Sequence, residues 1–327
     1  MVLRSLIRTF AGNMGMKFSV TIPAYKSQFL QKAIESVVSQ TYSDWELIIV
    51  DDCSPEDIKS IAEPFLNDKR ISYYRNEKNC GAVNVVDNWN ICLNYCTGDY
   101  VICMGDDDRL LPCCLEEYTK LIEKYPDLNV YHARTEIIDE KDQVTNMQEP
   151  RPEWESVLSM LWNRWDHRNK QFIGDFCYCT AYLKAAGGYY KMPLAWGSDD
   201  ITAVLAAKEQ GIANTQTFCF QYRENSQTIS SSSANAGVKI AARLNQYQWY
   251  LSFLDEMAHK NLSHDDRNYL KTIGIPRKKY FFKALDKDVP QYLKGNPMRL
   301  WWCYNQLKPF HYGKATFLKW YLKSIMP

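Results

Sequence analysis

The chain has 327 residues, of which 46% are hydrophobic, and a net charge of +1 at pH 7, which fits one large α/β domain with an appended region. No run approaches the ~20 apolar residues of a membrane-spanning helix, and residues 1–15 lack the pattern of a signal peptide. The eleven cysteines are scattered without a Cys-x-x-Cys pair and the five histidines lie far apart, which indicates reduced thiols in a cytoplasmic protein and argues against a zinc site.

The first half of the chain alternates between strand and helix patterns after residues 1–15, which we expect to be a tag or flexible extension. Residues 46–50, Glu-Leu-Ile-Ile-Val, are apolar almost throughout, as in a parallel strand that is covered on both faces. The alternation predicts a mainly parallel, Rossmann-like sheet flanked by helices. The expected strands are 18–22, 46–50, 71–74, 100–104 and 128–133, and the expected helices are 30–38, 54–66, 83–95 and 112–124.

The second half is less regular in its patterns. Residues 226–237 are rich in serine and are expected to form a loop or linker. The chain is therefore divided into an α/β domain at 16–225, this linker, and a helical, basic and aromatic region at 238–327. Within the second half of the α/β domain we expect helices near 153–164 and 200–210, an apolar segment at 176–183, a turn at Gly187-Gly188 and a strand at 217–222.

Aspartates follow two of the predicted strands at the points where these strands end. Asp51 and Asp52 follow one strand, and the run Asp106, Asp107 and Asp108 follows another. Because parallel strands end at one edge of a sheet, where open α/β sheets bind ligands, both groups should converge on one cleft. Helix capping is the competing role, but the first helix already has Ser54 before Pro55, and Pro112 lies too far from the run. Adjacent carboxylates repel one another, and their hard oxygens suit Mg²⁺ or Mn²⁺ that holds a diphosphate.

Four ordered segments carry a more specific signal. They are Phe18-Ser-Val-Thr-Ile-Pro-Ala-Tyr25, Gln40-Thr-Tyr-Ser-Asp-Trp-Glu-Leu-Ile-Ile-Val-Asp-Asp52, Gly98-Asp-Tyr-Val101 and Gly105-Asp-Asp-Asp-Arg-Leu-Leu-Pro112. In this order and spacing they resemble glycosyltransferase family 2, including the enzymes of bacterial polysaccharide assembly. The resemblance implies a GT-A catalytic domain at 16–225 that transfers a sugar, with inversion, from a nucleotide-sugar to a carbohydrate or lipid-linked acceptor. Uridine is the default base by resemblance.

The resemblance also implies roles for individual residues. Asp107 would coordinate Mg or Mn, with Asp106 alongside toward ribose or metal, and the cation would stabilise the departing diphosphate. The pair Asp199-Asp200 resembles the family's Glu-Asp pair, which makes Asp200 the candidate general base and Asp199 the next candidate. An ordinary helix N-cap is the alternative for Asp200. The base and ribose of the nucleotide would contact Pro23, Ala24, Tyr25, Asp51 and Asp52.

Three positions depart from the family pattern. Gly105 stands where many members have an aspartate, although Asp106 and Asp107 keep their places. Asn88-Trp89-Asn90 stands where many relatives have an Arg-Asn pair, so an arginine that would steady the donor is missing, and packing is the favoured role for Trp89. Asp199 is shorter than the usual glutamate, which gives it less reach.

Other functional classes are weaker matches to the sequence. No Gly-x-Gly-x-x-Gly follows the first strand and no phosphate-binding Gly-x-x-x-x-Gly-Lys-Ser/Thr occurs, so a dinucleotide-dependent dehydrogenase and a P-loop kinase are disfavoured. A sugar-phosphate nucleotidyltransferase would need a glycine-rich and basic loop where Pro23-Ala-Tyr25 stands. A catalytically silent sugar-nucleotide-binding scaffold also remains as an alternative.

Charge is divided unevenly along the chain. Residues 267–327 hold thirteen Lys and Arg against two Asp, a net charge of +11 interleaved with thirteen aromatic residues, so the rest of the chain carries −10. Two interpretations stay open: contact with the anionic inner face of a membrane, which would make the protein peripheral, or packing of the aromatic residues onto the acidic domain. Nucleic acid is disfavoured as a partner because the clefts elsewhere are rich in aspartate.

Overall fold

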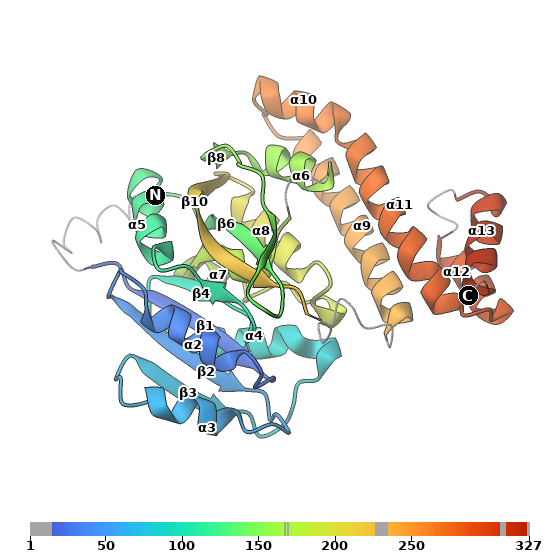
Figure 1. The fold of residues 1–327 in the computed structure, drawn as a ribbon. Helices are drawn as coiled ribbons and strands as arrows, with labels where there is room; N and C mark the ends of the chain where they lie inside the picture. Colours follow the sequence, from blue (N-terminus) through green and yellow to red (C-terminus); the bar gives the residue numbers. More distant parts are fainter. Residues whose placement is uncertain (1–14, 167, 169, 226–234, 308–311, 326–327) are drawn as a thin grey trace.

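The computed structural model describes residues 15–166, 168, 170–225, 235–307 and 312–325. Nearly all of the expected extension at 1–15 and most of the expected linker at 226–237 lie outside the described residues. A central sheet carries helices on both faces, and a group of helices from the last third of the chain stands beside it (Figure 1).

The sheet is mixed, with the order β3-β2-β1-β4-β9-β6-β10-β5. The first four strands in this order are parallel, which confirms the expected parallel core, and β9 lies antiparallel between β4 and β6. β10 is parallel to β6, while β5, β7 and β8 form short antiparallel pairs at that side. The strands are β1 Phe18–Ala24, β2 Trp45–Asp51, β3 Ile71–Arg75, β4 Tyr100–Cys103, β5 Arg109–Leu110, β6 Val130–Ile138, β7 Val144–Met147, β8 Trp154–Glu155, β9 Phe176–Cys179 and β10 Ile212–Arg223.

Alternation along the strands divides the core into two layers. In β2, Leu47 and Ile49 face one cluster and Ile48 and Val50 face the other, because successive side chains of a strand point to opposite faces. The first layer is closed by α2 Leu30–Val38, α3 Ile58–Ala62 and α5 Cys114–Lys124. The second is closed mainly by α4 Val85–Tyr95, α6 Val157–Trp165 and α8 Ser198–Ala207, with α7 Thr180–Ala185 beside them.

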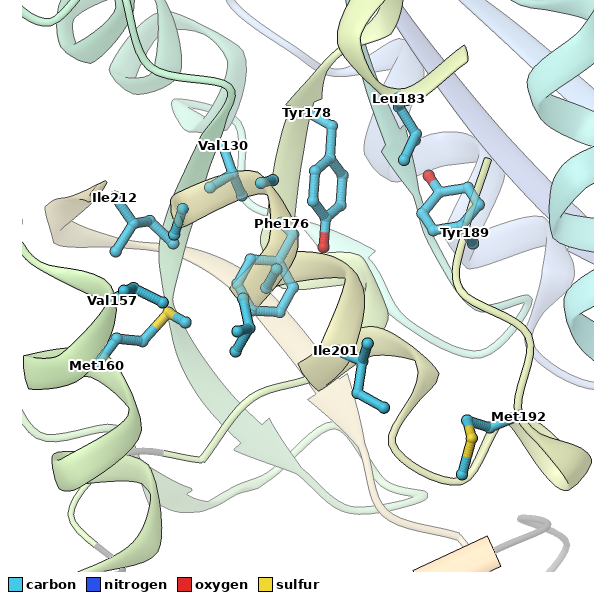
Figure 2. Close-up of a cluster of buried hydrophobic side chains, with 14 of the residues drawn as sticks. Val130, Val157, Met160, Phe176, Tyr178, Leu183, Tyr189, Met192, Ile201 and Ile212 are labelled. Atoms are coloured by element: carbon cyan, nitrogen blue, oxygen red, sulfur yellow. The ribbon is translucent and has the colours of Figure 1, made fainter. Parts of the chain in front are cut away.

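The second layer fixes the position of α8. Figure 2 shows Ile201 of α8 in the same buried cluster as Phe176 of β9 and Met160 of α6. Ile201, Ala203 and Val204 are buried almost completely, so most of the helix is embedded between the sheet and α6. This burial holds the amino end of α8, which carries Asp199 and Asp200, in one place.

The last third of the described chain is helical, as expected. It consists of α9 Ala236–Ala258, α10 His264–Thr272, α11 Gly274–Leu293, α12 Pro297–Leu307 and α13 Lys314–Ile325. α9 and α11 run side by side, α10 and α11 contact α6, and α12 and α13 lie at the far end from β3 (Figure 1). None of the helices in the described ranges combines the length and apolar character that crossing a bilayer requires.

Several element boundaries differ from the sequence prediction, among them the start of α3 and the start of α9. The helix expected from residue 54 begins only at Ile58, because the Asp57 carboxylate accepts a hydrogen bond from the Ser60 amide, whereas Ser54 donates its hydroxyl hydrogen to the Tyr25 carbonyl. The linker was expected to extend to residue 237, but α9 already begins at Ala236. Ser54 thus joins β2 to the end of β1.

Candidate active site

A cavity of about 750 Å³ lies at the carboxyl edge of β1, β2 and β4. Both aspartate groups reach this edge, as the parallel arrangement predicts, and the amino end of α8 lines the same cavity. Seven of the residues singled out from the sequence line this one cavity: Pro23, Tyr25, Asp52, Asp106, Asp107, Asp199 and Asp200.

The loop after β4 separates its three aspartates by giving each a different partner. Asp106 accepts hydrogen bonds from the Tyr25 and Lys26 amides at 2.8 and 2.7 Å. Asp107 receives a hydrogen bond from the Asn225 side chain at 2.6 Å and lies 3.5 Å from the Lys26 ammonium. Asp108 is buried and accepts from the Arg223 amide at 2.9 Å. Of the three, only Asp106 and Asp107 line the cavity.

Burial and mutual repulsion set the charge state of this loop. Burial, with the neighbouring Asp107 charge, raises the pKa of Asp106 to about 6, and the same causes raise the pKa of Asp108 well above its usual value. The Asp107 side chain is 13% exposed and faces the cavity. A cation beside Asp107 would reduce the repulsion that these carboxylates exert on one another.

The two aspartates after β2 have different environments. Asp52 lines the cavity, and its carboxylate is fixed by the Asn76 side chain at 2.8 Å and the Cys80 amide at 3.0 Å. Asp51 is fully buried and bonds to Tyr73, Arg75 and the Ser54 amide. Neither Asp51 nor Ala24 is among the residues that line the cavity, and their contact with the nucleotide stays a prediction from the sequence. Asp51 instead holds β2, β3 and the loop at Ser54 together.

The pair at the amino end of α8 is also divided. Asp200 is 6% exposed and is held by Arg164, whose Nε and Nη2 atoms lie 3.1 and 3.3 Å from its two oxygens, while the Gln171 amide donates to it at 2.8 Å. Asp199 is half-buried, lines the cavity and forms no ion pair with a described residue. Burial, with the adjacent Asp200 charge, raises the pKa of Asp199 to about 7.

Several cavity residues were not predicted from the sequence. Arg164 comes from α6, Arg243 and Gln246 from α9, and Tyr280 from α11. The approach of α9 is close: at Gly197, whose φ is +85°, a Cβ atom would lie 2.0 Å from the Gln246 Nε2 atom. These residues belong to no short motif, and only the fold brings them to the site.

The Asn88-Trp89-Asn90 segment is mainly structural. The Trp89 ring is buried and packs edge-on against Tyr189 with centroids 5.8 Å apart, as expected for a packing residue, although it also borders the cavity. The Asn90 side chain accepts a hydrogen bond from the Tyr189 amide at 2.8 Å, which joins α4 to the turn at Gly187-Gly188.

Arg223, at the end of β10, anchors the acidic loop. Its side chain is fully buried and donates to the carbonyl oxygens of Asp107 and Asp139 at 2.9 and 2.7 Å, and it pairs with Asp142 at 2.6 Å. Its guanidinium also lies over the Phe29 ring, 4.2 Å from the centroid. No sequence pattern indicated this role, because the residues that Arg223 joins are far apart along the chain.

Replacing Arg223 with Met should therefore lower the free energy of unfolding by about 3 kcal/mol, because the carbonyls of Asp107 and Asp139 would lose their charged donor and Asp142 would keep, among the described residues, only Lys32 and Arg109 as ion-pair partners. Urea denaturation followed by circular dichroism measures this loss. Lys120→Met is the matched control, since Lys120 is exposed and forms only surface pairs, and it should change stability by less than about 0.5 kcal/mol. Equal midpoints for both variants and the parent protein would remove Arg223 as an anchor.

Within the described ranges, no three His, Cys, Asp or Glu side chains are grouped so that they could enclose a metal ion by themselves. Asp106 and Asp107 are still compatible with a cation that takes most of its ligands from elsewhere, since Mg²⁺ is commonly bound by one or two carboxylates together with substrate phosphates and water.

Comparison with known proteins defines the class. The model of Glycosyl transferase family 2 matches residues 19–184, which is half of the chain, and the protein belongs to this family. The match ends before α8, so Asp199, Asp200 and the helical wall of the cavity lie outside it.

Individual relatives agree with this class. A 97-residue region is 37% identical to the GalNAc(5)-diNAcBac-PP-undecaprenol beta-1,3-glucosyltransferase of Campylobacter jejuni and covers 29% of this chain and 31% of that protein. A 128-residue region is 34% identical to an uncharacterized glycosyltransferase of Haemophilus influenzae and covers 37% and 40% of the two chains. The chain thus spans less than half the length of the curated relatives it matches.

The likeness to solved structures extends further along the chain. Residues 1–349 of S. aureus TarS in complex with UDP-GlcNAc superpose with a TM-score of 0.63 at 15% identity, over 94% of this chain and 89% of that one. At this identity the likeness establishes the fold, a GT-A α/β domain with a helical C-terminal region, as the sequence predicted.

Proposed function

We propose that this protein is an inverting glycosyltransferase that moves a sugar from a nucleotide-sugar, with UDP as the carrier, to an acceptor hydroxyl in polysaccharide or glycolipid assembly. The observation that carries the proposal is the single cavity in which Asp107 at the sheet edge faces Asp199 at the start of α8. Inverting transfer needs charge stabilisation at the leaving diphosphate and a base at the acceptor, on opposite faces of the sugar.

The sheet edge suits the nucleotide diphosphate. Tyr25, which is 44% exposed, and Asp52, whose carboxylate is a hydrogen-bond acceptor, both line the cavity. Lys26 supplies a positive charge next to Asp107, where it can offset phosphate oxygens. These contacts support a nucleoside diphosphate bound between the β1 end and the acidic loop.

Mg²⁺ or Mn²⁺ would be held here by Asp107, with Asp106 beside it. The carboxylates fit such a cation because they are hard oxygen ligands at the cavity wall and repel each other without one. When bound, the cation stabilises the negative charge that develops on the leaving diphosphate. Asp108 and Arg223 keep the loop in place for this purpose.

For the proton acceptor the geometry favours Asp199 over Asp200, which reverses the order that the family resemblance suggested. The Asp200 carboxylate is already occupied by Arg164 and Gln171, whereas Asp199 faces the cavity without an ion pair to a described residue. A pKa near 7 also suits a general base at neutral pH. Asp200 then acts as a positioning residue that ties α8 to Arg164 of α6.

This assignment predicts a pH dependence. The kcat/KM for the nucleotide-sugar should fall about tenfold per pH unit below about 7, because a raised pKa leaves Asp199 protonated there and unable to accept a proton. Protonation of Asp106, whose pKa is about 6, would weaken the binding of UDP instead. Measuring the affinity for UDP over the same pH range therefore separates this effect from the fall in kcat/KM that protonation of Asp199 causes. A kcat/KM that stays constant down to pH 5 would contradict an Asp199 base.

The relatives suggest the acceptor class. The Campylobacter jejuni relative is named for an undecaprenol-linked acceptor, and we extend the class of lipid-linked glycans to this chain as part of the proposal. The two alternative functions differ in their products. A silent nucleotide-sugar-binding scaffold releases no product, and a nucleotidyltransferase forms pyrophosphate.

A thermal-shift panel tests the donor side of the proposal. UDP, GDP, their sugar derivatives and dTDP-sugars are compared with Mn²⁺ and with EDTA, because a ligand that binds only the native state raises the melting temperature. UDP and a UDP-sugar should raise it with Mn²⁺ and much less with EDTA. Stabilisation by none of the nucleotides would remove the proposal of a nucleotide-sugar enzyme.

A further inference from the structure

The two last helices carry large apolar side chains that the fold leaves uncovered. We define the α12–α13 face as these five residues, which are between 42% and 72% exposed: Met298, Trp301, Leu318, Leu322 and Ile325. Soluble surfaces commonly expose single apolar residues, whereas several exposed together on two helices that contact each other are typical of a contact site.

These residues are not the inward side of the helices. α12 already buries Cys303 and Leu307, and α13 buries Phe317 and Trp320, against Leu293 and other residues of α11. The Trp320 indole donates to Asp286 at 2.6 Å, which fixes the rotation of α13. The helices therefore have one apolar side that holds the fold together and a second that faces outward.

Helical spacing arranges the outward side of α13 into a stripe. Leu318, Leu322 and Ile325 follow one another at intervals of four and three residues, so they lie on one face, and at 100° per residue Lys314 and Lys319 fall on its two borders. Lys319 is 57% exposed and reaches Asp286 only at 3.6 Å. An apolar stripe bordered by lysines is typical of a helix that lies in a membrane interface.

Apart from Asp286 of α11, which lies 3.6 Å from Lys319, the charged residues of this end of the chain are basic. After Asp288 the sequence contains no Asp or Glu up to residue 327, whereas it contains six Lys and Arg. Pairing of this face with the same face of a second copy would bring lysines together and is disfavoured. An anionic surface satisfies both the lysines and the apolar residues.

We propose that the α12–α13 face docks the protein on an anionic phospholipid surface, with its apolar side chains among the headgroups and its lysines at the lipid phosphates. The sequence left membrane contact open for the whole of residues 267–327, and the proposal now assigns that contact to α12 and α13 alone. Phe281 of that region has a structural role, since its ring packs against Trp165 of the catalytic domain and Tyr250 of α9.

The fold links this face to the cavity. α11 presents Tyr280 to the cavity and, thirteen residues later, Leu293 to the core beneath α12 and α13, a distance of roughly 20 Å along the helix. Docking would thus hold the cavity at a fixed short distance from the bilayer, where a lipid-linked acceptor could reach it. This consequence rests on the proposed function, whereas the docking itself does not.

Sedimentation with vesicles tests the docking. Full-length protein should bind vesicles of phosphatidylcholine and phosphatidylglycerol at low salt, bind phosphatidylcholine alone weakly, and dissociate as salt is raised. The variant Lys314→Gln/Lys319→Gln/Lys323→Gln should reduce the partition coefficient roughly 100-fold, since the three lysines contribute about equally. Leu318→Ser/Leu322→Ser should also reduce binding to the anionic vesicles.

The matched control carries the same charge change on the opposite end of the molecule (Figure 1). Lys59→Gln/Lys69→Gln/Lys78→Gln replaces three exposed lysines near α3 and β3 and should keep binding within about threefold. Unchanged melting temperatures show that the variants are folded. Protein that stays in the supernatant with anionic vesicles, an equal loss in the control, or a dimer that Leu318→Ser/Leu322→Ser dissociates would each overturn the proposal. Because no nucleotide is present, failure of the proposed enzyme activity leaves this result unaffected.

Discussion

Asp199→Asn should lower the rate of UDP release from a UDP-sugar by roughly two to four orders of magnitude, the usual contribution of a general base. The amide has the shape of the carboxylate but cannot accept the proton of the attacking hydroxyl. Donor affinity should change little, because the nucleoside diphosphate is proposed to bind at the acidic loop after β4, whereas Asp199 lines the cavity from α8. Steady-state assays with saturating Mn²⁺ and a range of donor concentrations separate the two effects.

Stability distinguishes Asp199 from its neighbour. Because the pKa of Asp199 is raised by burial, its ionised form costs folding free energy, so at pH 8 the Asn variant should be as stable as the parent protein or more stable. Asp200→Asn should instead destabilise, since the buried Arg164 loses its ion pair. If the Asp199 variant keeps near-normal turnover while a folded Asp200 variant loses it, the base is Asp200, as the family resemblance suggested.

Asp107→Asn should lower turnover by about two orders of magnitude or more and abolish the gain in UDP affinity that Mn²⁺ provides, because the leaving diphosphate would lose several kcal/mol of charge stabilisation. Isothermal titration with UDP, in Mn²⁺ and in EDTA, measures the binding part. Asp87→Asn is the control, since Asp87 is 42% exposed, pairs with Lys191 and does not line the cavity. Equal UDP affinity in Mn²⁺ and EDTA for the parent protein would exclude this role of a metal.

The parallel core of the sheet could be predicted from the sequence because the patterns that indicate its strands lie within short segments of the chain. An apolar run followed by aspartates indicates where a strand ends, and in a parallel sheet such strands end at the same edge. The convergence of Asp52 with Asp106 and Asp107 could therefore be predicted. It could not be predicted that Asp51 turns away from its neighbour, because its partners Tyr73 and Arg75 come from β3, more than twenty residues later.

The partners of Asp199 and Asp200 could not be predicted either, because they too come from distant parts of the chain. Sequence resemblance ranked Asp200 first, and nothing near it indicated that Arg164, 36 residues earlier, would pair with its carboxylate. The wall formed by α9 and α11 carries no motif at all, because its cavity residues are single side chains on long helices. Composition alone could not divide the C-terminal aromatic residues either: Phe281 packs on the catalytic half, whereas Trp301 is 66% exposed.

The identity of the reaction product tests the proposed glycosyltransferase activity most sharply. The protein is incubated with Mn²⁺ and the nucleotide-sugar that stabilises it most, with and without a lipid-linked glycan extract, and released UDP, pyrophosphate and sugar are quantified. We expect slow UDP release that an acceptor accelerates, a product of inverted anomeric configuration, and loss of both in Asp199→Asn and Asp107→Asn. Pyrophosphate as the product, or a donor that binds but releases no UDP under either condition, would contradict it.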